Sequence, residues 1–165
     1  MLENLSLRSA VEFAVKTEEI GAAQYDRLAK QFAEDVELRE LFSTLASDER
    51  MHEGQFRAHL SKLPPEPLES VQYEKADYLR AMSISEMFHG ERFRRAAETI
   101  GSREDALELS LGLEKSTLLY YQAMREVLGA SDVLQAIIAA EKEHVVRVAR
   151  YLIAGGRVRG LSDPY

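Results

Sequence analysis

The chain has 165 residues, of which 45% are hydrophobic, and its formal net charge is −7 at pH 7. These values predict one folded globular domain and argue against nucleic-acid binding, because an acidic surface repels phosphates. The absence of cysteine excludes disulfides, thiolate zinc sites, iron–sulfur clusters and thiol nucleophiles. The N-terminus lacks the pattern of a secretory signal, and no apolar run approaches the ~20 residues of a membrane span. We therefore expect a cytoplasmic protein without a membrane segment.

Helix-forming residues and helical periodicity predict an all-α fold. The first helix is expected from about Ser6 to Ala33. Asp35 can cap a second helix, which continues to about Lys62. The proline-rich stretch LPPEPLES then ends this helix, because proline cannot continue it.

The second half of the chain begins with a less regular segment, residues 71–82. The motif SISE, from Ser83 to Glu86, has the spacing of a capping box and predicts a short helix that ends near Ile100. Ser102 can cap a third long helix, which should run to about Leu128.

Gly129 is the expected stop of that third long helix, and Ser131 can cap a fourth, which should end at the glycine pair 155–156. Within each pair of long helices the connection is short, so the two helices should be antiparallel neighbours. A connection of about 40 residues, with the short helix inside it, joins the pairs. We therefore predict a four-helix bundle over residues 1–156 and a C-terminal tail over residues 157–165.

Each long helix has one face on which apolar residues recur at steps of three and four, and this face should point to the interior. A glutamate stands near the middle of each face, at Glu18, Glu49, Glu114 and Glu141. Two of these glutamates begin a Glu-x-x-His motif, ERMH and EKEH, which adds His52 and His144. Residues three apart lie on the same face of a helix, so each motif directs a carboxylate and an imidazole to one place.

The two helix pairs are an internal duplication. An offset of 96 residues superposes Glu18 on Glu114 and Tyr25 on Tyr121. An offset of 92 residues superposes Glu49 on Glu141 and His52 on His144. The difference of four residues falls in the loop between the helices.

Four carboxylates and two imidazoles should therefore converge inside the bundle. Buried carboxylates repel one another and lose their hydration, whereas two divalent cations would neutralise them. Oxygen and imidazole ligands suit iron or manganese, and one glutamate per helix with two Glu-x-x-His motifs is the pattern of di-iron and di-manganese carboxylate proteins. The candidate metal ligands and catalytic residues are Glu18, Glu49, His52, Glu114, Glu141 and His144. The alternative is that these residues are exposed, but the apolar residues on the same faces argue against it.

Tyr25 and Tyr121 lie on the same faces as the glutamates that precede them by seven residues. Each hydroxyl could donate a hydrogen bond to a metal-binding carboxylate, or the ring could simply pack in the core.

A third Glu-x-x-His motif, Glu86 with His89, is better explained by the capping role of Glu86. We expect His59 to pack in the core or beside the site. The neighbouring glutamates Glu19, Glu53 and Glu143, and the basic run from Arg92 to Arg95, should lie on the surface.

The two motif sets, E18…Y25…E49-R-M-H52 and E114…Y121…E141-K-E-H144, resemble the ferritin-like di-iron domain of rubrerythrins. The resemblance covers residues 8–62 and 104–154. It implies that Glu49 and Glu141 bridge two iron ions and that Glu18 and Glu114 are terminal ligands. It also implies that His52 and His144 each bind one ion.

The resemblance implies a peroxidase that reduces hydrogen peroxide, or an enzyme that reduces dioxygen, by cycling two irons between the ferrous and ferric states. Manganese or zinc could substitute for iron. Rubrerythrins are typically cytoplasmic and often dimeric, so a homodimer is expected. Two other functions stay open: ferroxidase activity in iron storage or handling, and a bundle that binds metal without catalysis.

The chain departs from many rubrerythrins in two ways. They carry a further glutamate three residues after the third-helix ligand, where this chain has Thr117. That glutamate accompanies redox-linked movement of one iron, so its absence argues against efficient peroxidase turnover. They also often carry a rubredoxin domain with four cysteines, and this chain has none. The electrons would then come from a separate, rubredoxin-like donor protein.

Overall fold

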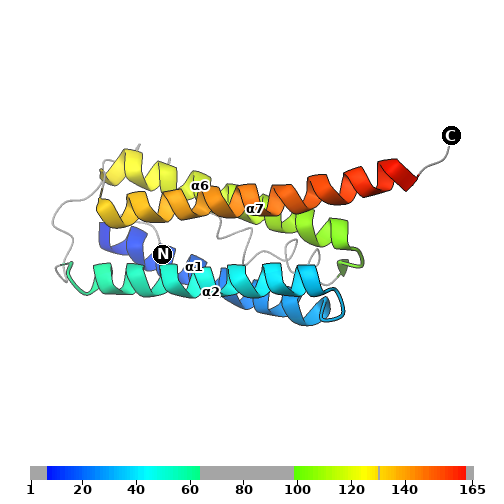
Figure 1. The fold of residues 1–165 in the computed structure, drawn as a ribbon. Helices are drawn as coiled ribbons and strands as arrows, with labels where there is room; N and C mark the ends of the chain where they lie inside the picture. The colour runs from blue at the N-terminus through cyan, green and yellow to red at the C-terminus, as the bar shows by residue number, and fades with distance from the viewer. Residues whose placement is uncertain (1–6, 64–98, 130, 163–165) are drawn as a thin grey trace.

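The computed structural model describes residues 7–63, 99–129 and 131–162. Within these ranges the long elements are all helices, and no residue is in a strand. The helices are α1 (Leu7–Gln31), α2 (Val36–Leu60), α6 (Arg103–Leu128) and α7 (Asp132–Ser162) (Figure 1). The predicted all-α fold is therefore confirmed. In this part of the chain, no helix has both the length and the apolar character needed to cross a membrane.

The helices form two hairpins that lie against each other (Figure 1). Helix α1 packs along α2, and α6 packs along α7. Contacts between α1 and α6 and between α2 and α7 join the hairpins. This arrangement is the predicted ferritin-like four-helix bundle. The predicted short helix, from Ser83 to about Ile100, lies almost wholly outside the described residues and stays a prediction.

Side-chain caps begin three of the helices where the sequence predicts them. Asp35 Oδ1 accepts a hydrogen bond from the Leu38 amide at 3.0 Å, so it supplies an acceptor for one unpaired N–H of the first turn of α2. The Ser102 hydroxyl does the same for Asp105 N at 3.1 Å, at the start of α6. Ser131 Oγ accepts from the Leu134 amide of α7 at 3.2 Å. The caps therefore fix where each hairpin turns.

The end of α7 differs from the prediction. The helix was expected to stop at Gly155–Gly156, but it continues through both glycines to Ser162. A glycine ends a helix when it adopts a positive φ angle, and among the described residues only Gly129 does so, with φ 90° after α6. Glycine inside a helix costs only about 1 kcal/mol relative to alanine, so a long helix can accommodate it.

The core has two apolar clusters with a polar layer between them. One cluster contains Val11, Phe56, Tyr121 and Ile137 among its buried members. The other contains Leu28, Phe42, Leu45, Leu113 and Val148. Along every helix the predicted glutamate falls between a residue of one cluster and a residue of the other. The bundle therefore places all four glutamates at the same level, enclosed by apolar side chains above and below.

Candidate metal centre

All six predicted ligands are buried, each at most 5% exposed. One side chain comes from α1, one from α6, and two each from α2 and α7. The ligands are Glu18, Glu114, Glu49 with His52, and Glu141 with His144. The three-residue spacing within α2 and α7 places each imidazole one turn after its glutamate on the same helix face. The structure therefore brings the whole predicted set together; binding of metal by it stays a prediction.

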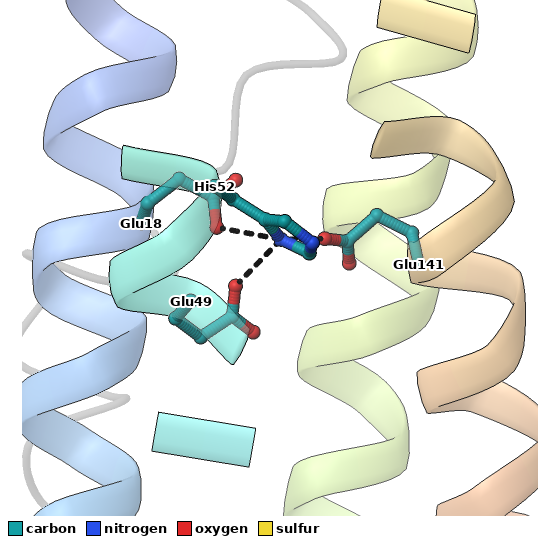
Figure 2. A group of neighbouring side chains, drawn as sticks. All are labelled: Glu18, Glu49, His52 and Glu141. Atoms are coloured by element: carbon teal, nitrogen blue, oxygen red, sulfur yellow. Dashed lines mark ion pairs between the residues drawn. The ribbon is translucent and has the colours of Figure 1, made fainter. Parts of the chain in front are cut away.

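The first group of donors surrounds His52 (Figure 2). Its Nδ1 atom lies 3.1 Å from Glu141 Oε1 and 3.4 Å from Glu49 Oε2. Glu18 Oε2 lies 3.5 Å from the same nitrogen. One donor atom from each of these four residues falls within 4.8 Å of all the others, which is close enough for a single ion to contact them all.

The second group of donors surrounds His144. Its Nδ1 atom lies 3.2 Å from Glu114 Oε2, 3.7 Å from Glu49 Oε1 and 3.9 Å from Glu141 Oε2. The donor atoms of these four residues also lie within 4.8 Å of one another. The two imidazole rings are stacked with their centroids 5.4 Å apart. The site therefore contains two neighbouring places with similar donors.

Glu49 and Glu141 belong to both groups. Each of these glutamates has one oxygen facing His52 and the other facing His144. Glu18 and Glu114 each belong to one group only. This division is the one that two bridging and two terminal carboxylates would have around a pair of ions.

Unpaired atoms in the cluster test whether a metal fits. Several buried nitrogen and oxygen atoms of the candidate ligands have no hydrogen-bond partner. They are Glu18 Oε2, Glu49 Oε2, both nitrogens of His52 and both carboxylate oxygens of Glu141. Elsewhere in the described residues only two nitrogens of Arg27 share this property. Buried polar atoms are normally paired, because an unpaired one costs about 1–3 kcal/mol. Metal coordination would satisfy the carboxylate oxygens and His52 Nδ1, and an oxygen and imidazole donor set fits an ion such as iron.

Comparison with known proteins points in the same direction. The sequence model of the rubrerythrin family matches residues 9–74, which include α2 and all of α1 except its first two residues. This match over part of the chain supports a rubrerythrin-like, ferritin-like protein. Comparison with curated proteins and with solved structures gave no match.

The electrostatics of this rubrerythrin-like site favour a partly protonated cluster when only protein atoms are present. Burial raises the pKa of Glu49 well above its usual range, and the charge of Glu18 adds to the effect. Burial also raises the pKa of Glu141 to about 8, against the opposing contact with His52. Burial alone would lower the pKa of His52, but Glu141 and Glu18 raise it to about 10. A metal ion that binds here must therefore displace protons.

Two tyrosines connect the hairpins through the site. Tyr25 on α1 donates a hydrogen bond to Glu114 Oε1 on α6. Tyr121 on α6 donates an equivalent bond to Glu18 Oε1 on α1. Each hydroxyl thus donates to a candidate metal ligand of the other hairpin, and a role for either tyrosine beside a bound metal stays a prediction. Burial and the adjacent glutamate charges raise the pKa of both phenols well above 10, so the tyrosines keep their protons.

Sequence reasoning missed two residues that touch the site. Asp48 Oδ2 lies 3.3 Å from His144 Nε2, which is the ring nitrogen facing away from the cluster. Arg147 Nη1 donates to the same oxygen at 3.0 Å. The available signal was that Asp48 precedes Glu49, one turn before His52, near the candidate face. Nothing in the helical period shows that it meets a histidine of the other hairpin.

A small cavity adjoins the carboxylates on the side of α1 and α6. It gives the centre of a water-sized molecule about 10 Å³ of room, which is enough for about one such molecule. Its lining consists of Thr17, Glu18, Gly21, Tyr25, Glu49, Leu113, Glu114 and Thr117. Thr117 is thus buried beside the site, at the position where rubrerythrins often have a further glutamate.

The remaining candidates lie away from the cluster or outside the described residues. His59 is half-buried and lines a separate, mostly apolar cavity of about 200 Å³ near the end of α2. Glu19 and Glu143 are exposed as predicted, whereas Glu53 is half-buried and pairs with Arg57. Glu86 with His89, and the basic run from Arg92 to Arg95, fall outside the described residues.

Proposed function

We propose that this chain is a di-iron oxidoreductase of the rubrerythrin type, which reduces hydrogen peroxide or dioxygen with electrons from a separate donor protein. The observation that carries the proposal is the pair of four-residue donor groups that share Glu49 and Glu141. The rubrerythrin match over α1 and α2 supports it.

Charge supports two ions rather than one. Four ionised carboxylates carry four negative charges, and two divalent ions neutralise all of them. A single ion would leave two buried carboxylates unpaired or protonated. In the proposed site Glu49 and Glu141 would contribute to both metal positions, Glu18 and His52 would complete one, and Glu114 and His144 would complete the other.

The residues around the ligands would keep this arrangement in place. Tyr25 donates a hydrogen bond to Glu114 Oε1, and Tyr121 donates one to Glu18 Oε1. The other oxygen of each carboxylate is then available for an ion. The two apolar clusters exclude water from above and below. The metal pair would supply the redox chemistry, since two ferrous ions give the two electrons that, with two protons, convert one peroxide to two waters.

The small cavity supports a small oxidant as the substrate. It lies against Glu18, Glu49 and Glu114, so a molecule inside it would be next to the proposed ions. Room for about one water-sized molecule is compatible with peroxide or dioxygen after minor side-chain movement, but not with an organic substrate. Because the chain has no cysteine, the thiolate-bound metal typical of an electron donor must come from another protein or domain. The homodimer and the cytoplasmic location stay predictions.

The test is oxidation of the ferrous protein under anaerobic conditions. Protein loaded with two equivalents of Fe²⁺ is mixed with one equivalent of hydrogen peroxide, and oxidation is followed by stopped-flow absorbance. We expect oxidation at least ~10-fold faster than that of free Fe²⁺ under the same conditions, since the site binds the iron pair beside the oxidant cavity. Glu18→Ala should lose this advantage. Glu19→Ala is the matched control, because Glu19 is adjacent but exposed and paired with Lys16.

Two results would contradict the proposal. Oxidation no faster than that of free Fe²⁺ would favour a metal-binding bundle without catalysis. Fast oxidation by dioxygen, with little response to peroxide and a large closed assembly in size-exclusion chromatography, would favour ferroxidase activity in iron storage.

A further inference from the structure

The two histidines of the site differ at their outer ring nitrogens. His144 Nε2 faces the carboxylate of Asp48 at 3.3 Å. His52 Nε2 is buried and has no hydrogen-bond partner. The inner nitrogens, in contrast, have similar surroundings, because each Nδ1 faces carboxylates of the shared cluster. The asymmetry therefore lies outside the ligand set.

Arg147 holds the Asp48 carboxylate in position. It donates to Asp48 Oδ2 at 3.0 Å, and the two side chains are 38% and 27% exposed. His144, Asp48 and Arg147 thus form a chain of contacts from the buried site to the surface between α2 and α7.

The duplicated frame shows that the other half lacks this chain of contacts. The offset of 92 residues that superposes His52 on His144 also superposes Asp48 on Ala140 and Gln55 on Arg147. Ala140 is half-buried, as Asp48 is, but it has no carboxylate. His52 therefore has neither the acceptor nor the arginine that would hold one.

We propose that Asp48 is a positioning residue for His144, and that it makes the metal position at His144 bind metal before the position at His52 and more tightly. This inference rests on the proposed metal site and adds an order of loading to it. An acceptor on the outer nitrogen favours the tautomer with its proton on Nε2, which leaves the Nδ1 lone pair for the metal and fixes the ring. Loss of such an outer partner typically lowers metal affinity about 10–100-fold.

The test is a zinc titration followed by NMR of the histidine rings in the full chain labelled with ¹⁵N-histidine. Zinc is diamagnetic, and the chain has only four histidines, so His52 and His144 can be followed separately. In the unsubstituted protein we expect the ring signals of His144 to shift with the first equivalent of Zn²⁺ and those of His52 with the second.

Substitutions beside each of the two histidines make the test specific for Asp48. Asp48→Ala should remove the order and lower the affinity for the first zinc about 10–100-fold, whereas Asp48→Asn, which keeps an acceptor, should lose less. Ala140→Asp gives His52 a carboxylate and should make both histidines respond together. Asp26→Ala is the control, because it removes a more exposed carboxylate from another interhelical ion pair, that with Arg50, and Asp26 contacts neither histidine of the site.

Parallel shifts of both histidines in the unsubstituted protein would overturn the inference while leaving the proposed site intact. An unchanged order in Asp48→Ala together with no effect of Ala140→Asp would do the same. Absence of any zinc-dependent shift at either histidine would overturn the inference and the proposed metal site together.

Discussion

The α1–α2 and α6–α7 hairpins carry the same candidate ligands but different surroundings. Each hairpin contributes a glutamate, a Glu-x-x-His motif and a tyrosine that donates to a glutamate of the other hairpin. The equivalent positions next to the ligands differ, with Gly21 in α1 where α6 has Thr117, and Asp48 in α2 where α7 has Ala140. The residues repeated in both hairpins therefore specify which atoms could contact metal. The neighbouring residues that are not repeated can make the two metal positions differ in their properties.

The largest expected effect is on metal affinity. Removing a carboxylate that belongs to both donor groups should cost more affinity than removing one that belongs to a single group. Glu141→Ala should lower the affinity for both ions by more than about 100-fold, because Glu141 belongs to both donor groups. Glu18→Ala should retain about one ion per chain. Metal content after equilibrium dialysis measures this difference, and Glu143→Ala, an exposed change on the same helix, is the control. Equal metal loss in Glu141→Ala and Glu18→Ala would break the division into bridging and terminal ligands.

Next in size is the pH dependence of the metal-free protein. The pKa of Glu141 is raised to about 8 and that of His52 to about 10, so the folded state binds these protons more tightly than the unfolded state. The resulting stabilisation is complete below each unfolded pKa and is lost as the pH rises through the folded one. Between pH 6 and 9 we therefore expect the melting temperature to fall by at least ~5 °C.

Calorimetry with and without Zn²⁺ checks this expectation. Bound metal replaces the protons, so the metal-loaded protein should show a smaller fall or a rise over the same range. Glu141→Gln, which cannot ionise, should reduce the fall in the metal-free protein. A melting temperature that rises with pH in the metal-free protein would contradict the assigned protonation.

Tyr25 and Tyr121, which each donate to a glutamate of the other hairpin, test whether repeated residues contribute equally to stability in the two hairpins. Tyr25→Phe and Tyr121→Phe each remove one buried hydrogen bond and leave a carboxylate oxygen unpaired, at a cost of about 1–3 kcal/mol in the free energy of unfolding. Urea denaturation should give similar values for both. Tyr120→Phe is the control, because Tyr120 is buried beside Tyr121 outside the carboxylate cluster. Clearly unequal losses in the free energy of unfolding would show that the two hairpins are equivalent only at the candidate metal ligands.

The smallest effect concerns Gly21, where the hairpins differ in side-chain size. A Cβ added at Gly21 would lie 3.5 Å from Glu49 Cγ, which is an ordinary van der Waals contact. Gly21→Ala should therefore stabilise the fold by up to about 1 kcal/mol through helix propensity. Gly54→Ala in α2 is the control, since nothing lies within 4 Å of its added Cβ. Net destabilisation by Gly21→Ala alone would show that the space beside Glu49 is required.

Periodicity and repetition were sufficient to predict most of the fold and which candidate ligands come together. Each candidate ligand lies on a helix face that its apolar neighbours mark for burial, as Leu45 and Phe56 do for Glu49 and His52. The 92- and 96-residue offsets identified partners without any knowledge of how the helices pack. Helix caps such as Asp35 and Ser102 were also predictable, because capping depends on residues only three positions apart.

Contacts between the hairpins could not be predicted in this way. The meeting of Asp48 with His144, and the choice of Glu114 by Tyr25, depend on the rotation and register of one hairpin against the other. The helical period contains no information on that register. The continuation of α7 beyond Gly155 was missed for a different reason: a glycine stop requires a positive φ angle, which residue type permits but does not impose.

Anomalous scattering from a crystal of the iron-loaded protein would locate the bound metal directly. We expect two iron peaks, each in contact with Glu49 and Glu141. One peak should lie at Nδ1 of His52 beside Glu18, and the other at Nδ1 of His144 beside Glu114. A single peak, or iron bound away from these six residues, would contradict it.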